Sequence, residues 1–199
     1  MKSFENAMIK RRSIYQLSAS SPIADDKIQE IIELAIQNTP TAFDSQSTKV
    51  VVLFNEAHHK LWDIVKETLR KIVPQNNFDR TEKKIQGFKN AYGTILYFDD
   101  TEVTNAYASN NPSYAENFPI WANQSNGMLQ YAIWVALREY GLGANLQHYN
   151  PLIDQEVKEN FKIPTSWNLI AQMPFGAIEE DAPVKEYKQA MNQRIKVIK

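Results

Sequence analysis

The stretch PIWANQSNGMLQYAIWVALREYGLGANLQHYNP, residues 119–151, carries the strongest structural signal in this chain. Apolar residues occur on nearly every side of residues 121–140, a pattern typical of a helix that is buried all round. Pro119 fits the first turn of this helix, and Gly141 favours a left-handed conformation at its end. We therefore predict a long helix that lies in a domain core or at a subunit interface.

Shorter patterns before and after this helix predict further helices and strands. Apolar residues at helical spacing predict helices over residues 4–11, 25–38 and 57–72, and a solvated helix face over residues 75–90. Apolar runs predict strands at residues 50–54, 94–98 and 167–174, the first of them covered on both faces. Helices and strands of this kind indicate an α+β fold.

Three other segments have distinct patterns. Asn150 and Pro151 are predicted to be the cap and the first residue of another helix. Residues 107–119 are rich in Asn, Ser, Pro and Tyr, which neither pack nor alternate, so we expect a mobile loop there. Residues 194–198 alternate polar and apolar side chains, which predicts a strand without a partner nearby in the sequence.

The composition describes a folded domain with nearly balanced charge. Of 199 residues, 43% are hydrophobic and 23% charged, so we expect a single domain over residues 1–199. The 22 Lys and Arg residues against 23 Asp and Glu residues argue against nucleic acid or an anionic membrane as a partner. Residues 1–20 lack the apolar region of a signal peptide, and no apolar run could span a bilayer. We expect a soluble cytoplasmic protein.

The sequence lacks the residues that several kinds of chemistry require. Without cysteine there are no disulfides, thiolate metal sites or cysteine nucleophiles. His58, His59 and His148 do not have the spacing of a zinc site, so we expect no metal, and a lone histidine such as His148 is more often structural than a base. Neither a Gly-rich phosphate loop nor a Gly-x-Ser-x-Gly nucleophile motif is present. If the protein is an enzyme, a bound organic cofactor is expected to carry its chemistry.

A candidate anion site lies at the end of the first helical pattern, in Arg11-Arg12-Ser13. Two guanidinium groups offer a fork of donors that matches phosphate oxygens, and the hydroxyl adds another donor. Alternatively, these cations only complement the negative end of a helix dipole. The three residues alone slightly favour the second interpretation.

A second candidate site is the polar loop of residues 39–47, which leads into the apolar run of residues 50–54. A polar loop attached to a buried strand is well placed to hold a ligand. Asp44 and Ser45 could equally satisfy their own backbone in an Asx or Ser turn. Gln46 has no role in such a turn, which keeps the ligand interpretation open.

Taken together, three motifs resemble the nitroreductase family. They are Arg11-Arg12-Ser13-Ile14-Tyr15, the loop of residues 39–47 with its strand, and residues 141–151, GLGANLQHYNP, of which the last is the most specific. The similarity extends over nearly the whole chain and is strongest to a short branch related to fungal fatty-acid-repression proteins and bacterial stress-induced nitroreductases. The resemblance implies an α+β fold with a mixed sheet flanked by helices, and a homodimer in which the C-terminal strand joins the partner's sheet.

The same resemblance implies an FMN cofactor and residues that bind its phosphate. Arg11, Arg12 and Ser13 are expected to hold the FMN phosphate and ribityl chain. Arg194 and Lys185 are candidates for closing the phosphate site.

Other residues are expected to contact the flavin ring by resemblance. Asp44 and Gln46 correspond to the family's loop at the isoalloxazine and ribityl edge. The turn Gln147-His148-Tyr149 corresponds to the segment whose backbone N–H groups face flavin N5 and O4. The branch commonly has asparagine in place of Asp44, and a carboxylate cannot donate to a flavin carbonyl.

The function implied is an FMN-dependent oxidoreductase of a stress response. It would pass electrons from NADH or NADPH to nitroaromatic or quinone-like small molecules by a ping-pong mechanism, with flavin N5 carrying the hydride and no catalytic side chain. The alternative is a flavin-binding regulatory or lipid-signalling protein with little turnover, because some fungal relatives have signalling roles.

Overall fold

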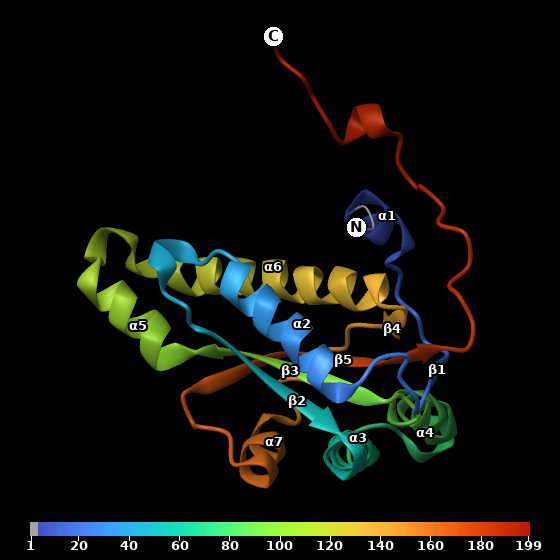
Figure 1. The fold of residues 1–199 in the computed structure, drawn as a ribbon. Coiled ribbons are helices and arrows are strands. Elements are labelled where there is room, and N and C mark those ends of the chain that lie inside the picture. The colour runs from blue at the N-terminus through green and yellow to red at the C-terminus, as the bar shows by residue number, and fades with distance from the viewer. Residues whose placement is uncertain (1–3) are drawn as a thin grey trace.

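A five-stranded sheet forms the centre of the computed structural model, which describes residues 4–199 (Figure 1). The strands are β1 (Leu17–Ser18), β2 (Thr48–Phe54), β3 (Gly93–Asp100), β4 (Leu142–Ala144) and β5 (Trp167–Ile178). Their order is β1-β5-β3-β2, with β4 also paired to β5, and these ladders are antiparallel. Among the described residues, the only parallel pairing is the isolated bridge between Ser13 and Ala144. β2 is an edge strand.

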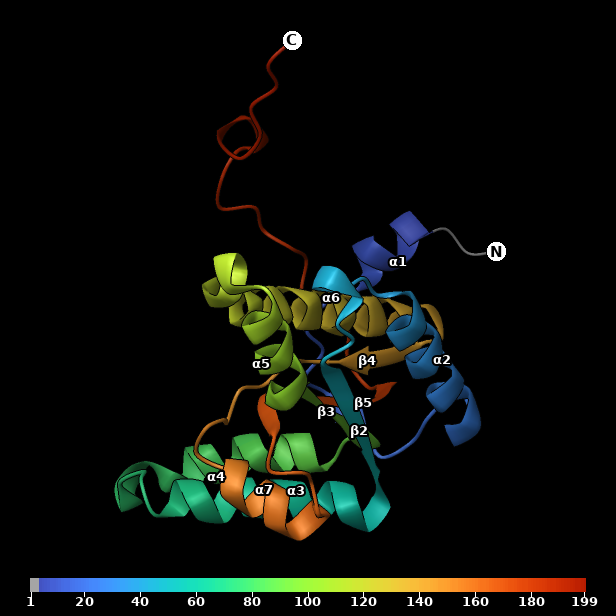
Figure 2. The same cartoon turned by 90° about the vertical axis from the view of Figure 1, so that its left-hand side faces the viewer.

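Helices cover both faces of this sheet, as expected for an α+β fold (Figure 2). Helices α2, α5 and α6 lie on one face, and α3, α4 and α7 lie on the other. The helices are α1 (Phe4–Lys10), α2 (Asp25–Asn38), α3 (Asn55–Arg70), α4 (Gln75–Lys89), α5 (Thr101–Asn110), α6 (Phe118–Glu139) and α7 (Asp154–Phe161). None of the helices between residues 4 and 199 is long and apolar enough to cross a membrane.

The alternation of side chains on β3 divides the core into two layers. Ile95 and Tyr97 pack in a cluster with α2 and α6, whereas Leu96 and Phe98 pack in a cluster with α3, α4 and α7. All four side chains are fully buried. Because successive side chains of a strand point to opposite faces, a strand between two helical layers is apolar throughout.

Helix α6 confirms the long helix predicted from the sequence, but only one of its sides is buried in this chain. Leu129, Ile133 and Leu137 pack into the core between α2, β3 and β5. The opposite side exposes Ile120, Met128 and Tyr131, with 54%, 46% and 41% of their surface accessible. The helix is followed by Gly141 at φ 86°, which confirms the predicted left-handed end.

The prediction of a mobile loop over residues 107–119 is wrong. Helix α5 continues to Asn110, a 3₁₀ turn covers Pro112–Asn117, and α6 begins at Phe118. The Asn111 side chain donates to the Tyr107 carbonyl oxygen at 2.9 Å, and the Tyr107 ring packs against Phe118 with centroids 6.1 Å apart. Polar composition predicted a loop, but these aromatic contacts hold the segment on the end of α6.

The helix predicted to begin at Pro151 begins instead at Asp154. The Asn150–Pro151 peptide bond is cis, and residues 150–153 form turns. Asn150 does not cap the helix, because its Oδ1 atom accepts a hydrogen bond from Gln172 Nε2 at 3.3 Å. A contact with strand β5 therefore replaces the predicted cap.

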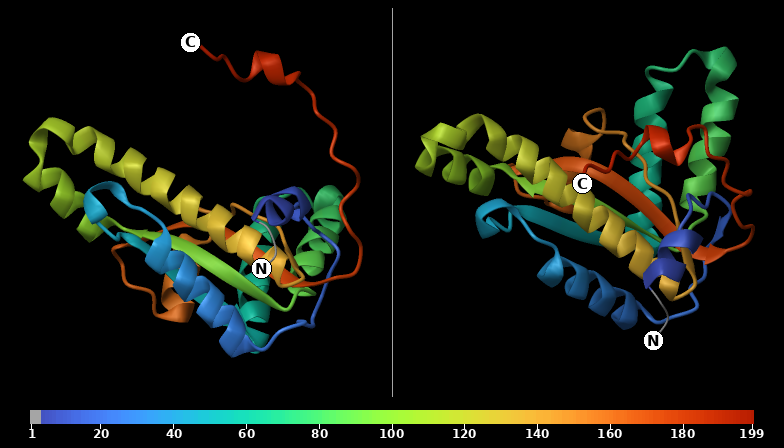
Figure 3. Two further views of the ribbon diagram at one scale, coloured as in Figure 1. Left: turned by 45° about the horizontal axis from the view of Figure 1, so that its top comes forward. Right: turned by 90° about the horizontal axis from the view of Figure 1, so that it is seen from above.

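The strand predicted in the tail is not formed within this chain. After β5 the chain passes α1 and runs away from the sheet, with a single 3₁₀ turn at Met191–Gln193 (Figure 3). Val197 and Ile198 are 72% and 82% exposed. The tail therefore buries little of its apolar surface within this chain.

Candidate functional site

The Arg11 side chain lies on helix α6, where it is held by aromatic rings. Its guanidinium carbon is 4.5 Å from the centre of the Trp134 ring and 5.9 Å from that of Tyr131. The Nε atom is buried and has no hydrogen-bond partner among the described residues. Buried donors are normally satisfied, so this position has the capacity to bind an acceptor that the chain itself does not supply.

Arg12 and Ser13 connect this position to the tail and to the sheet. Arg12 Nη1 donates to the Pro183 carbonyl oxygen at 2.8 Å, across 171 positions of sequence. Lys185 follows two residues after Pro183, and its Nζ lies 5.3 Å from the centre of the Tyr187 ring. Ser13 forms the parallel bridge with Ala144 of β4. Of the predicted phosphate residues, Arg11, Arg12 and Ser13 thus lie together between α6, the tail and β4.

The turn Gln147-His148-Tyr149 presents one free backbone donor rather than three. The Gln147 N–H donates to the Gln172 carbonyl oxygen at 2.7 Å, and the Tyr149 N–H donates to Gln172 Oε1 at 2.8 Å. The His148 N–H has no hydrogen-bond partner in the described chain, and the residue is exposed. Of the three backbone N–H groups in the turn, only that of His148 remains available to a ligand.

Asn145 and Gln172 are buried polar residues whose importance sequence reasoning missed. Asn145 Nδ2 donates to the Ile14 carbonyl oxygen at 2.8 Å, and its Oδ1 accepts from Gln147 Nε2 at 2.8 Å. These bonds join the segment after Arg11 to the turn of residues 147–149. The predicted phosphate residues 11–13 and this turn therefore lie together. Asn145 and the turn share one sequence motif, which is the signal that could have identified it.

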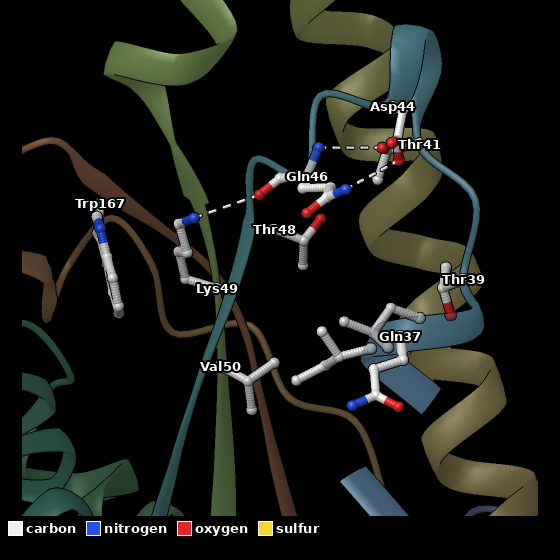
Figure 4. A pocket seen from close by; sticks show the side chains of 11 residues that line it. Gln37, Thr39, Thr41, Asp44, Gln46, Thr48, Lys49, Val50 and Trp167 are labelled. Carbon is white, nitrogen blue, oxygen red and sulfur yellow. Dashed lines mark hydrogen bonds between the residues drawn. The ribbon is translucent and has the colours of Figure 1, made fainter. Parts of the chain in front are cut away.

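The polar loop that contains Asp44 and Gln46 is strained. Phe43, Asp44 and Gln46 have φ angles of 57°, 52° and 53°, in the left-handed region that favours glycine. Each costs about 1 kcal/mol or more, and such strain concentrates at functional sites. The Gln46 N–H donates to Thr41 Oγ1 at 3.0 Å, while Gln46 Nε2 donates to Asp44 Oδ1 at 3.1 Å (Figure 4). Asp44 therefore does not form the alternative Asx turn with its own backbone.

A cavity of about 540 Å³ lies between this loop, the end of α2 and the start of β2 (Figure 4). Asp44 and Gln46 line it, together with Lys49, whose Nζ donates to the Gln46 carbonyl oxygen at 3.3 Å. Thr48 also lines it and has a buried hydroxyl without a partner among the described residues. The volume is typical of a small-molecule site. Sequence reasoning missed Thr48, Lys49 and Trp167, which also lines the cavity.

Within one chain the predicted residues form two groups along α6. Phe43 of the polar loop stacks on Trp121, while Arg11 contacts Trp134. The helical rise between these two tryptophans is about 20 Å. Arg194 joins neither group, because it is exposed and follows the 3₁₀ turn Met191–Gln193 in the tail.

The hydroxyl of Tyr149 in the turn has an altered pKa. Burial raises the pKa of Tyr149 to about 12, so its hydroxyl stays neutral, and its ring packs edge-on against Trp62 at 6.0 Å. Between residues 4 and 199 no three or more His, Asp or Glu side chains are grouped in a way that could hold a metal ion.

Comparison with known proteins gives consistent matches over most of the chain. A model described as the nitroreductase family matches residues 8–177. HBN1 of Saccharomyces cerevisiae is 37% identical over 168 residues, which are 83% of each chain. The nitroreductase FRM2 of the same yeast is 31% identical over 173 residues, 86% of each chain. The nitroreductase CinD of Lactococcus lactis, solved in complex with chloramphenicol, is 40% identical with a TM-score of 0.89, over 99% of this chain and 100% of CinD.

Proposed function

The chain belongs to the nitroreductase family of oxidoreductases and has its α+β fold, as its motifs predicted, and from this premise we propose an FMN-dependent enzyme. It would pass electrons from NADH or NADPH to nitroaromatic or quinone-like acceptors. CinD was solved with chloramphenicol and with 4-nitrophenol, both of which carry a nitro group on an aromatic ring. CinD was also solved with nicotinic acid, whose pyridine ring resembles that of a nicotinamide. These complexes support the proposed classes of substrate.

The observation that carries the FMN proposal is the unsatisfied Nε atom of Arg11. A phosphate oxygen would accept from this donor, and contact with Trp134 already orients the guanidinium group. Arg12 and Ser13 follow Arg11 directly and would add donors, although one Arg12 N–H already binds the Pro183 carbonyl oxygen. Lys185, two residues after Pro183, would add a further donor. The residues present therefore fit a dianionic phosphate.

The turn of residues 147–149 and the polar loop each fit part of a flavin ring. The free His148 N–H is a donor suited to a ring nitrogen or carbonyl oxygen, and the buried Gln172 holds that turn rigid through the flanking N–H groups. Asp44 and Gln46 offer a carboxylate and an amide at the mouth of the 540 Å³ cavity. When bound, FMN supplies the redox chemistry, because a flavin can exchange a hydride with a nicotinamide and pass electrons on in a ping-pong sequence. The chain's residues bind and orient, and protons come from solvent.

We also propose that the enzyme is a homodimer, which would bring the two groups together. The exposed side of α6, with Ile120, Met128 and Tyr131, is an apolar strip on the same helix that holds both groups. Gly127 lies on this strip, and a Cβ atom there would meet nothing within 4 Å among the described residues. A mid-helix glycine is unfavourable by about 1 kcal/mol relative to alanine, and close approach of a second helix explains it. A second copy would then contribute its polar loop beside Arg11 of the first.

Strand exchange would account for the tail. Ile195 and Val197 alternate with polar residues and are 59% and 72% exposed. The outer edge of β2 pairs with no strand of the described chain, and an unpaired edge is a template for another strand. We propose that the tail of one subunit extends the partner's sheet.

The visible spectrum of the purified protein tests the proposal. A flavin spectrum, release of free FMN on denaturation, and steady oxidation of NADH or NADPH with 4-nitrophenol would support an enzyme. A yellow protein without turnover would instead favour the regulatory alternative, and a colourless one that does not take up FMN would contradict both. We further propose that the protein works in the cytoplasm in a stress response, which cell fractionation and expression measurements under oxidants would test.

A further inference from the structure

Arg138, in the last turn of α6, joins three segments that are far apart in the sequence. Its Nε atom donates to the Lys10 carbonyl oxygen, at the end of α1, at 3.2 Å. Its Nη2 atom donates at 3.0 Å to Oδ1 of Asp181, which lies just after β5. Figure 3 shows α1 lying beside this end of α6. One guanidinium group therefore holds the end of α1 and the start of the tail against the same turn of α6.

The side of α6 that carries Arg138 also holds the Arg11 side chain. Tyr131, Trp134 and Arg138 are spaced three and four residues apart, so they lie on one side of the helix. Arg138 fixes the carbonyl group of Lys10. The next residue, Arg11, has its guanidinium carbon 4.5 Å from the centre of the Trp134 ring. The helical rise between Trp134 and Arg138 is about 6 Å, so this segment is held at two neighbouring turns of α6.

The start of the tail is bound to the same region at two points. Asp181 accepts a hydrogen bond from Arg138. Two residues further along the chain, the Pro183 carbonyl oxygen accepts from Arg12 Nη1 at 2.8 Å. The tail is therefore joined directly to Arg12 and, through Arg138, to the backbone that precedes Arg11. A displacement of the tail would alter the position of Arg11 as well.

Stability of the fold does not explain the contacts of Arg138. The Asp181 side chain is 69% exposed, and an ion pair with an exposed partner contributes little to stability. The Lys10 carbonyl group ends a helix, where water can serve equally well as a partner. The Arg138 side chain is only 16% exposed, so it gives up hydration and conformational freedom to make these contacts. The positions that they give to α1 and the tail are the better explanation.

We propose that Arg138 is a positioning residue for the FMN phosphate, which it does not touch. It holds Lys10 and the tail so that the buried Nε atom of Arg11 faces the phosphate. The inference rests on the proposed function and adds a link between the tail and the affinity for the cofactor. Asp181 contributes to the same effect, because it orients the guanidinium group of Arg138. Without either residue, Arg11 is still present but its guanidinium group is no longer fixed.

The affinities of the flavin-free protein for FMN and for riboflavin test this inference, because riboflavin is FMN without the phosphate. The parent should bind FMN more tightly than riboflavin. Arg138→Gln should raise the Kd for FMN about fivefold to tenfold, less than Arg11→Ala does, and should leave the Kd for riboflavin unchanged. Asp181→Ala should raise the Kd for FMN about twofold to threefold. A role limited to stability would weaken the binding of both ligands alike.

Three further variants separate positioning from loss of charge. Arg138→Lys keeps the charge but not the fork of donors, and should recover part of the FMN affinity. Arg70→Gln removes a guanidinium group that pairs with Glu82 at 3.3 Å on the other side of the sheet, and should bind FMN as the parent does. In an Arg11→Ala background, Arg138→Gln should cause no further loss of FMN affinity, because the group that it positions is gone.

Failure of the inference and failure of the proposed function give different results. If Arg11→Ala loses the preference for FMN over riboflavin but Arg138→Gln keeps it, the inference is overturned and the phosphate site stands. Equal losses of FMN and riboflavin affinity in Arg138→Gln would also overturn it, since Arg138 would then support only the fold. A parent that binds neither flavin, or both equally, would contradict the phosphate site and the inference together.

Discussion

The guanidinium group of Arg11 lies over the ring of Trp134, with 4.5 Å between the guanidinium carbon and the ring centre. This contact orients the side chain by a cation–π interaction, yet leaves its buried Nε atom without a hydrogen-bond partner in the described chain. The side chain is thus positioned by helix α6, while its buried donor remains available to the proposed phosphate.

Replacing Arg11 with alanine should weaken FMN binding while the fold survives. A charge-assisted contact to phosphate is worth roughly 1.5–3 kcal/mol, so the Kd should rise about tenfold to a hundredfold in a titration of apoprotein. Arg11→Lys keeps the charge but loses the fork and should be intermediate. Thermal stability of the Arg11→Ala apoprotein should change little, because loss of the cation–π contact with Trp134 is offset by removal of an unsatisfied buried donor. Parental FMN affinity would show that the phosphate binds elsewhere.

Deleting residues 194–199 should produce a monomer that loses its flavin. In the proposed dimer the tail extends the partner's sheet, and its exposed apolar residues gain burial only there. Size exclusion with absorbance at the flavin wavelength measures both effects at once. Lys196→Ser is the matched control, since it alters the tail without removing an apolar side chain. A truncated protein that still elutes as a yellow dimer would contradict strand exchange.

If the exposed strip of α6 is the dimer interface, a leucine at Gly127 should break the dimer, whereas a leucine at the comparable Gly87 should not. Gly127 in α6 and Gly87 in α4 both have open space where a Cβ atom would lie, among the described residues. Gly127→Leu should shift the protein from dimer to monomer in analytical ultracentrifugation, because leucine would keep a second helix from close approach. Gly87→Leu, on the other side of the sheet, should leave the mass unchanged. A dimeric Gly127→Leu variant would exclude this strip as the interface.

Asp44→Asn should raise the reduction potential of the bound flavin. Reduced flavin is an anion, and a carboxylate about 6 Å away opposes its charge by roughly 0.7 to 2.8 kcal/mol for dielectric constants of about 80 to 20. For two electrons this is about 15 to 60 mV, and the exposure of Asp44 favours the lower end. A redox titration against a reference dye measures the shift. Asp79→Asn, an exposed carboxylate on α4, controls for net charge, and an equal potential in both variants would remove Asp44 from the flavin site.

His58 should make the fold sensitive to acid. It is fully buried, with Nδ1 2.8 Å from Thr94 Oγ1 and Nε2 3.1 Å from the Lys89 carbonyl oxygen, and burial lowers its pKa to about 4. An unfolded histidine has a pKa of 6.5. Between these values the unfolded state takes up a proton that the folded state does not. The free energy of unfolding should therefore fall as pH decreases from about 6.5 to about 4, by about 3 kcal/mol in total.

Urea unfolding at several pH values measures this loss. The His58→Gln variant cannot titrate, so its stability relative to the parent should improve by about 3 kcal/mol over the same interval. His59→Gln, which replaces the exposed neighbour, should keep the parental pH dependence. Parallel stability curves for the parent and His58→Gln would mean that folding does not lower the pKa of His58.

Local sequence patterns determined most of the secondary structure. Apolar runs identified β2, β3 and β5, and the all-round apolar pattern identified α6 with its left-handed end at Gly141. These features follow from side-chain periodicity and glycine geometry, which act over a few residues. The family was also readable from the sequence, because its most specific motif, residues 141–151, is contiguous.

Only the tertiary structure decided which polar groups bond within the chain and which remain available to a ligand. Asn145 bonds to Ile14 across 131 positions, and Arg12 bonds to Pro183 across 171, so neither partner could be assigned from neighbouring residues. The same holds for Asn150, which contacts Gln172 instead of capping a helix. The stacked rings of Phe43 and Trp121 likewise come from separate elements. A hydrogen bond or ring contact between distant segments depends on how the helices and strands pack, and periodicity along the chain carries no information about that packing.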